Sequence, residues 1–297
     1  MSATAPAPTA GASRRGAGRP GSPGSPGSPG SPGSPGSAVR VTQARVIRSE
    51  WTKLRTLRST MWSLLVAVVL TVGLGALICL ARGSNFDRES PEERLLFDPT
   101  ATSLVGLFLS QLAIGVLGVL VMSGEYATGM ARSTFAAVPH RLPVLWAKVV
   151  VFSAVVLVLM TAASLGAFLS GQAVFSHYRL GTSLGAHNVL RAVIGGGIYL
   201  TVIGLLGIGL GALLRRTAVA IAVLFGVLLV LPIIVNFLPS SYRDHIQKYL
   251  PSSAGQSLLQ VVHDPNSLSP WAGLAVMLAY AVVVLAGAAV LLRRRDV

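Results

Sequence analysis

Residues 192–238 read AVIGGGIYLTVIGLLGIGLGALLRRTAVAIAVLFGVLLVLPIIVNFL, two apolar runs separated only by Leu-Arg-Arg at 214–216. Each run is about 20 residues long, the length that a helix needs to cross a hydrocarbon core of about 30 Å. Neither run contains Asp, Glu, Lys, Arg or His. The stretch therefore predicts two transmembrane helices joined as a tight hairpin.

Four further runs of the same kind occupy 62–80, 103–122, 149–169 and 272–292. Only 11% of the chain is charged, against about 25% in soluble globular proteins. A soluble enzyme and a disordered protein are both poor fits to this composition. We expect an all-α polytopic membrane protein whose residues 62–297 form a domain of six transmembrane helices.

Two segments precede that domain. Residues 1–38 form a low-complexity tail with repeated Gly-Ser-Pro, which we interpret as a disordered linker. Residues 39–61 predict an amphipathic interfacial helix, because one arc of its surface is apolar and its basic side chains lie mostly off that arc. The alternative is a plain basic flank that only sets topology. The arc comprises Ala44, Ile47, Trp51, Leu54, Leu57 and Met61; Arg45, Arg48, Lys53 and Arg55 lie off it, Arg58 projects into it, and Glu50 sits near its edge.

The formal net charge of +14 is unequally divided between the segments expected on the two sides of the membrane. With the N-terminus inside, the inner segments hold 17 Lys and Arg against three acidic residues, whereas the outer segments hold seven of each. The positive-inside rule selects this orientation. We therefore expect a multi-pass plasma-membrane protein with both termini in the cytoplasm, and its basic charge predicts a membrane orientation and not a nucleic-acid partner.

The inner segment between the second and third spans, residues 123–148, is longer than a simple connector requires. Glu125 follows an apolar span and suits a helix N-terminus. Gly129 permits a sharp turn, and Pro139 and Pro143 end a helix before the next span. The pattern predicts a short cytoplasmic helix between helices 2 and 3; the alternative is a capped loop without a partner.

At these residues the chain resembles the permeases of type 2 ABC exporters. The resemblance rests on Gly124-Glu125-x-x-x-Gly129, on Arg132 and Thr134, on Pro139-His-Arg141 and on Lys148. It extends over most of residues 39–297, including Arg-x-x-x-Ser-Glu-Trp-x-Lys-Leu-Arg at 45–55 and Tyr-Leu-Pro-Ser-Ser-Ala-Gly at 249–255.

The resemblance implies a transport subunit that is not itself an enzyme. ATP and Mg would be bound by a separate ABC ATPase subunit, and a second permease chain, identical or related, would complete the bacterial exporter. The ATPase-coupling residues would be Glu125, Gly129, Arg132, Thr134 and Arg141, with Arg48, Trp51, Lys53 and Arg55 in the interfacial helix. Consistently, none of the three lysines follows a glycine, as the Lys of a P-loop does.

No cofactor or metal is expected in this chain. Its five histidines are scattered, and Cys79 is its single cysteine. Because the spans are neutral, an apolar or amphipathic exported compound, such as a drug or antibiotic, fits better than a small ion.

A structural or assembly membrane protein is one alternative function that the sequence leaves open, and there are two others. One is an ion-gradient-driven secondary transporter or channel, although proton-coupled carriers generally place ionisable groups within the membrane. The other is a hydrolase, since Gly181-Thr-Ser183-Leu-Gly185 fits the Gly-x-Ser-x-Gly nucleophile pattern. That pattern requires a strand-to-helix elbow, which an outer loop before the fourth span does not predict.

Overall fold

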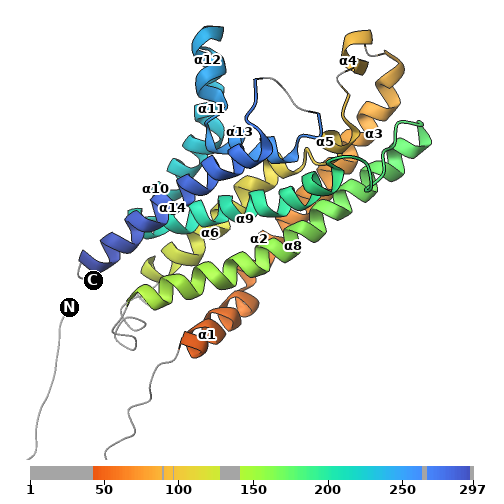
Figure 1. Cartoon of the computed structure of the whole chain (residues 1–297). Coiled ribbons are helices and arrows are strands. Elements are labelled where there is room, and N and C mark those ends of the chain that lie inside the picture. The colour runs from red at the N-terminus through yellow and green to blue at the C-terminus, as the bar shows by residue number, and fades with distance from the viewer. Residues whose placement is uncertain (1–42, 89, 96, 128–140, 263–265, 295–297) are drawn as a thin grey trace, which may run out of the picture. The chain divides into compact units, whose positions relative to one another are not determined.

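A computed structural model describes residues 43–297 apart from 89, 96, 128–140, 263–265 and 295–297 (Figure 1). Within these ranges every regular element is a helix, and no strand occurs. The α-helices are α1 (Gln43–Thr56), α2 (Arg58–Val69), α3 (Gly75–Asn85), α4 (Pro91–Leu95), α5 (Pro99–Ser103), α6 (Leu107–Ala127), α8 (Arg141–His177), α9 (Val189–Leu214), α10 (Thr217–Phe225), α11 (Leu231–Asn236), α12 (Ser240–Gln247), α13 (Pro251–Gln256) and α14 (Pro270–Arg294).

Six helices of the described chain are long and apolar enough to cross a membrane, which confirms the predicted number. They fit a multi-pass membrane protein. Each overlaps one predicted run: Arg58–Arg88, Leu107–Gly124, Leu142–His177, Val189–Leu214, Thr217–Asn236 and Pro270–Arg294. The third helix is much longer than its apolar run of 149–169, so it extends beyond that run at both ends.

Two of the six spans contain a wide π-helical turn, η1 (Leu70–Leu74) and η3 (Gly226–Val230). A π turn disturbs the regular backbone hydrogen bonding of an α-helix. Beside η1, the Ser110 hydroxyl from α6 lies 2.9 Å from the Ala67 carbonyl oxygen and 2.7 Å from the Thr71 hydroxyl. These buried hydroxyls satisfy the backbone where water is absent and tie the first span to the second.

Helix α9 lies at the centre of the packing, because α6, α8, α10 and α14 all contact it (Figure 1). Its glycines allow the closest of these contacts. A Cβ atom at Gly207 would collide with the Gly115 carbonyl oxygen of α6, and one at Gly118 would collide with the Gly204 carbonyl oxygen of α9. Small residues are what allow helix backbones to approach within a membrane, so α6 and α9 form the tightest pair.

We predict that Gly207→Val lowers the thermal unfolding temperature of the purified chain by several degrees, since overpacking costs about 1–3 kcal/mol. A thiol-reactive fluorophore measures this, because Cys79 is the single cysteine and is fully buried. The matched control is Gly226→Val, where no atom lies within 4 Å of an added Cβ. Equal unfolding temperatures for the two variants would contradict close α6–α9 packing.

Candidate functional site

Helix α1 packs against the beginning of α8. The Gln43 side-chain amide donates a hydrogen bond of 3.0 Å to the Pro143 carbonyl oxygen. One turn further along, Val46 is buried in a small apolar cluster with Val144 and Ala147. The apolar cluster and the amide contact therefore attach α1 to the first two turns of the third span.

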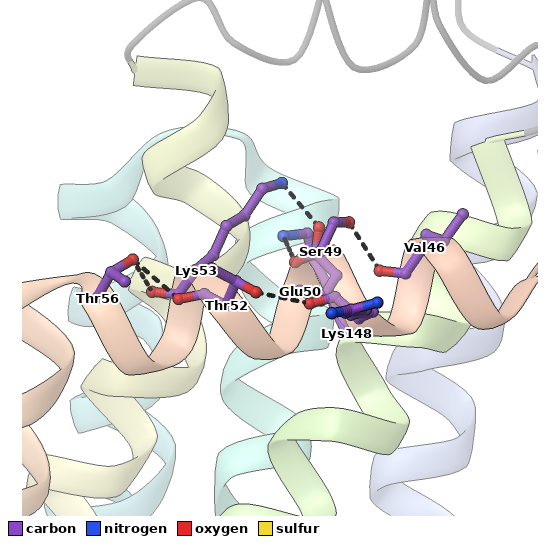
Figure 2. A network of polar contacts seen from close by, with 8 residues as sticks. Val46, Ser49, Glu50, Thr52, Lys53, Thr56 and Lys148 are labelled. Carbon is purple, nitrogen blue, oxygen red and sulfur yellow. Dashed lines mark hydrogen bonds and ion pairs between the residues drawn. The ribbon is translucent and has the colours of Figure 1, made fainter.

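An ion cluster extends this contact (Figure 2). Lys148 of α8 reaches Glu50 of α1, with 2.6 Å between its Nζ and the Glu50 Oε2. Lys53, one turn along α1, lies with its Nζ 2.7 Å from the other carboxylate oxygen, Oε1. The Lys148 and Glu50 side chains are 2% and 4% exposed, whereas the Lys53 side chain is 35% exposed. A single carboxylate thus holds one buried and one partly exposed ammonium group.

The two ion pairs differ in what they contribute. An exposed pair is worth about 0–1 kcal/mol, so the partly exposed Lys53 contributes little to stability. Breaking a buried pair from one side costs about 3–5 kcal/mol, because a charge is left without its partner in a poorly solvated site. The Lys148–Glu50 pair therefore fixes how α1 is attached to α8.

The end of the helix bundle that carries α1, here called the α1 end, also includes the end of α6 and the beginnings of α8 and α10. The Thr217 hydroxyl at the start of α10 donates a 2.9 Å hydrogen bond to the Ser123 hydroxyl near the end of α6. Segment 128–140, which joins α6 to α8, starts and finishes here. Helix α1 is thus held beside both attachment points of that segment.

A cavity of about 410 Å³ opens at the α1 end, within the usual range of about 300–1,000 Å³ for ligand pockets. The ion cluster forms one part of its wall. Apolar side chains of α6 and of the α1–α2 junction form most of the rest. Its lining consists of Glu50, Lys53, Leu54, Thr56, Leu57, Ser59, Thr60, Leu117, Leu120, Val121, Gly124 and Lys148.

The corner between α1 and α2 shapes this cavity. The predicted interfacial helix covers 39–61, but α1 ends at Thr56 and residues from Arg58 onward belong to α2. Between them Leu57 has extended backbone angles, φ −74° and ψ 113°. The chain therefore turns at Leu57, and the helix of the first span begins earlier than its apolar run at 62.

Three of the four predicted interfacial residues lie on the outward surface of α1, whereas Lys53 is partly buried beside Glu50 and lines the cavity. Arg48 and Arg55 are exposed, and Trp51 is 49% exposed. The side buried against the protein instead carries Val46, Glu50 and Leu54. The face packed against the protein thus includes Val46 and an ion-paired Glu50, which the predicted apolar arc does not contain, whereas Trp51 of that arc is exposed. That α1 lies at a membrane surface stays a prediction.

The predicted ATPase-coupling residues are only partly covered. Gly129, Arg132 and Thr134 lie outside the described residues. Glu125 lies in the last turn of α6 and Arg141 is the first residue of α8; the structure describes their backbones but not their side chains. The structure therefore describes the helices that precede and follow the predicted coupling helix. The coupling role of these residues stays a prediction.

Other candidate chemistry lies away from this end. The Gly-x-Ser-x-Gly pattern at 181–185 occupies the turn-containing connection between α8 and α9, where the Thr182 amide donates to the Gln172 side-chain oxygen at 2.7 Å. Within the ranges that the structure describes, no three His, Cys, Asp or Glu side chains gather as a metal site requires. The helical surroundings of Ser183 lack the strand of a nucleophile elbow.

A second polar contact lies in the interior of the bundle. The Tyr199 hydroxyl of α9 donates to the side-chain oxygen of Gln111 of α6, and both residues are buried. The Gln111 side-chain nitrogen has no hydrogen-bond partner among the described atoms. The neutral spans thus enclose a carboxamide with an unused donor, one of several polar side chains that are buried in the bundle.

Sequence reasoning missed the importance of Glu50. The sequence analysis placed Glu50 only near the edge of the predicted apolar arc, yet this residue is 3% exposed. A signal existed in the chain, because Glu50 is the only acidic residue in a strongly basic stretch from Arg40 to Arg58. A lone carboxylate among so many cations favours an ion pair, but its partner 98 residues away could not be read from local spacing.

Comparison of the chain with models of protein families and with curated proteins found no match.

The ion cluster yields a stability prediction. Lys148→Met leaves Glu50 in its buried position with only the partly exposed Lys53, so we expect a clear fall in unfolding temperature. Lys53→Met removes only the partly exposed ammonium group, so we expect a change within about 1 kcal/mol. Both variants are measured by the Cys79 dye assay.

The double variant Glu50→Leu, Lys148→Met tests the cause. Removing both buried charges avoids the unpaired carboxylate, so the double variant is expected to be more stable than Lys148→Met alone. If the stability lost in the double variant equals the sum of the losses in the two single variants, Glu50 and Lys148 do not interact directly.

Proposed function

We propose that this chain is the membrane-spanning permease subunit of an ATP-driven ABC export system, working with a separate ATPase subunit and a second permease chain. ATP and Mg would be bound by the ATPase. The chain would lie in the plasma membrane with the α1 end facing the cytoplasm, as its distribution of Lys and Arg favours. Six membrane-crossing helices and the resemblance at Gly124–Lys148 support this proposal.

The observation that carries the proposal is the buried ion pair between Lys148 and Glu50. Segment 128–140 is the part of the chain expected to contact the ATPase, and it leads directly into α8. A push on this segment would move the first turns of α8. Because Lys148 holds Glu50, the same movement would carry α1 with it, and α1 is joined at Leu57 to the first span. A movement of the ATPase at this one contact would thus be transmitted to the first, second and third spans together.

The cavity at the α1 end supports an apolar or amphipathic exported compound. Its walls are mainly aliphatic, and its ion cluster occupies only one part. A small hydrated ion would find few oxygen ligands there, whereas a compound with an apolar body would displace water from apolar surface. Export is favoured over a gradient-driven mechanism because the resemblance falls on a segment whose role is contact with an ATPase.

The direct test is reconstitution with a partner ATPase. We expect an adjacent reading frame to encode a Walker-motif ATPase, and the purified chain to form a complex with that ATPase and to raise its rate of ATP hydrolysis in proteoliposomes. Uptake of substrate into inverted vesicles should then require ATP. Transport by the chain alone under an imposed proton or sodium gradient would contradict the proposal and support a secondary transporter.

A single substitution tests the coupling segment. We expect Glu125→Ala to lower ATPase stimulation by about tenfold, the effect of losing one charged hydrogen bond at an interface. The matched control is Glu92→Ala, an exposed carboxylate in α4, which should stimulate as the unmodified chain does. If Glu125→Ala inserts normally and couples fully, Glu125 has no role in the contact.

A further inference from the structure

A second cavity lies at the end of the bundle opposite to the α1 end. The fifth span starts at the α1 end with Thr217 and finishes at Asn236, so the connection from there to α14 lies across the bundle from α1 (Figure 1). Residues of α11, α12, α13 and 266–268 enclose a cavity of about 330 Å³, here called the α12 cavity. Its volume falls within the usual range of about 300–1,000 Å³ for ligand pockets.

Carboxamide side chains form much of the wall of the α12 cavity. Among its described lining residues only Leu268 has an apolar side chain. Each carboxamide carries two N–H donors and an oxygen that accepts, so the wall presents both kinds of hydrogen-bonding group to a ligand. The carboxamides belong to Asn236, Gln247, Gln256, Gln260 and Asn266.

The charged side chains of the α12 cavity already have partners. The Arg243 Nε lies 3.1 Å from the Asp244 Oδ1, and the Lys248 ammonium group lies 5.4 Å from the centre of the Tyr249 ring. The guanidinium group and the carboxylate compensate each other's charge. A ligand selected by its charge would therefore find little net attraction here, and recognition depends on the neutral groups.

Helix α9 holds one side of the α12 cavity in place. The Gln256 side chain shares a hydrogen bond with the Tyr199 hydroxyl. The Arg191 Nη2 donates a 2.6 Å hydrogen bond to the Gln260 backbone carbonyl oxygen, and the Ser267 hydroxyl donates to the Gln260 side-chain oxygen at 2.9 Å. Because these contacts fix the two carboxamides before a ligand arrives, less ordering is required on binding.

The α12 side of the cavity is held less firmly. Helix α12 buries none of its residues. Neither Asn236 of α11 nor Gln247 of α12 has a side-chain hydrogen bond within the described part of the chain. These two carboxamides can therefore turn a donor and an acceptor towards a ligand without losing an existing contact.

A hydroxyl-rich ligand matches this set of groups. A hydroxyl both donates and accepts, so neighbouring hydroxyls of a sugar ring can bond the nitrogen and the oxygen of one carboxamide. A phosphate or carboxylate group only accepts, so it would leave the carboxamide oxygens unpaired, and an unmade hydrogen bond is costly away from water. An apolar compound would find only Leu268 to contact.

We propose that the α12 cavity binds a polyhydroxylated group such as a sugar ring. Gln256 and Gln260 form the fixed side of the site. Asn236 and Gln247 turn towards the ligand from the other side. A water-borne sugar or glycoside and the head group of a glycolipid both present this chemistry. That the cavity faces the outside of the cell rests on the proposed function; that it binds such a group does not.

Photolabelling of the full chain tests the binding. The chain is reconstituted without any ATPase into nanodiscs of phosphatidylcholine, and maltoside detergents are avoided because their head group would compete. The probe is maltose joined by a short ether link to a diazirine, and the control probes carry the same diazirine on tetraethylene glycol or on phosphate. Ether oxygens accept but do not donate. We expect the maltose probe to label 236–260 at least about fivefold more than either control, as the loss of one hydrogen bond predicts.

Four variants locate the site. Gln247→Leu removes a donor and an acceptor at similar size and should lower labelling by the maltose probe about fivefold. Asn85→Leu makes the same kind of change at an exposed carboxamide at the end of α3 that does not line the cavity, and should leave labelling unchanged. Lys248→Gln should change it less than about twofold, because recognition is not by charge. Ser253→Trp should block labelling by filling the cavity. The Cys79 dye assay verifies that each variant is folded.

Three results would overturn the proposal: equal labelling by the maltose and tetraethylene glycol probes, stronger labelling by the phosphate probe that depends on Lys248, or equal effects of Gln247→Leu and Asn85→Leu. Absence of labelling at 236–260 by both the maltose probe and a diazirine-bearing glucosyl diacylglycerol would also overturn it, and a cavity filled by another segment of this chain or by a second copy would give this result.

The two sugar probes distinguish the sources of the ligand. Labelling by the maltose probe that free maltose suppresses supports the proposal with a water-borne sugar or glycoside as the occupant. Labelling by the glucosyl diacylglycerol alone, with the same dependence on Gln247, supports it with a glycolipid as the occupant.

The binding result and the export result are independent. If a sugar probe labels 236–260 in a chain that never associates with an ATPase, the proposed function fails and the binding site stands. If the chain couples to an ATPase but neither sugar probe labels 236–260, the export function stands and the site is wrong.

Discussion

The close approach of α6 and α9 is the constraint on which the bundle depends. At Gly118 and Gly207 each helix leaves no room for a side chain on the other, while a Cβ at Gly115 or Gly204 would collide with Leu224 of α10 or Phe152 of α8. Lipid tails are as apolar as leucine, so burial of apolar area alone does not drive helices together in a membrane. Backbone contact supplies packing that larger residues would prevent. Once α6 and α9 are fixed, α8, α10 and α14 have a central helix to pack against.

The second constraint on the structure is the attachment of helix α1 to this bundle. Helix α1 buries few large apolar side chains: Val46 packs against Val144 and Ala147, and Leu54 is buried as well. The Lys148–Glu50 pair adds a directional contact that apolar packing lacks, because ammonium and carboxylate groups must meet within hydrogen-bond distance. Burial makes this contact hard to replace. Together with the turn at Leu57, it determines where α1 lies relative to the first and third spans.

The proposed transport mechanism follows from a difference in rigidity between the α6–α9 contact and the attachment of α1. The α6–α9 contact resists change, since backbone atoms touch and no side chain can rearrange. The α1 end is held by few contacts and encloses a cavity of about 410 Å³. The π turns at Leu70–Leu74 and Gly226–Val230 interrupt the regular hydrogen bonding of the first and fifth spans, so these spans have places to bend that α6 and α9 lack. A movement that begins at segment 128–140 would thus displace α1 and the first span, while α6 and α9 keep their positions.

The sequence by itself determined the number of membrane-crossing helices and their approximate limits, because a run of about 20 apolar residues has few stable forms in water and must be helical in lipid. It also determined that α1 is a basic helix before the first span, and it singled out Lys148. It did not determine which face of α1 is buried, since Trp51 and Leu57 looked more apolar than Glu50. Only the tertiary structure brought Lys148, 98 residues away, to Glu50. Local periodicity measures what a helix surface would prefer in isolation, whereas burial of a charge is decided by a partner that another helix supplies.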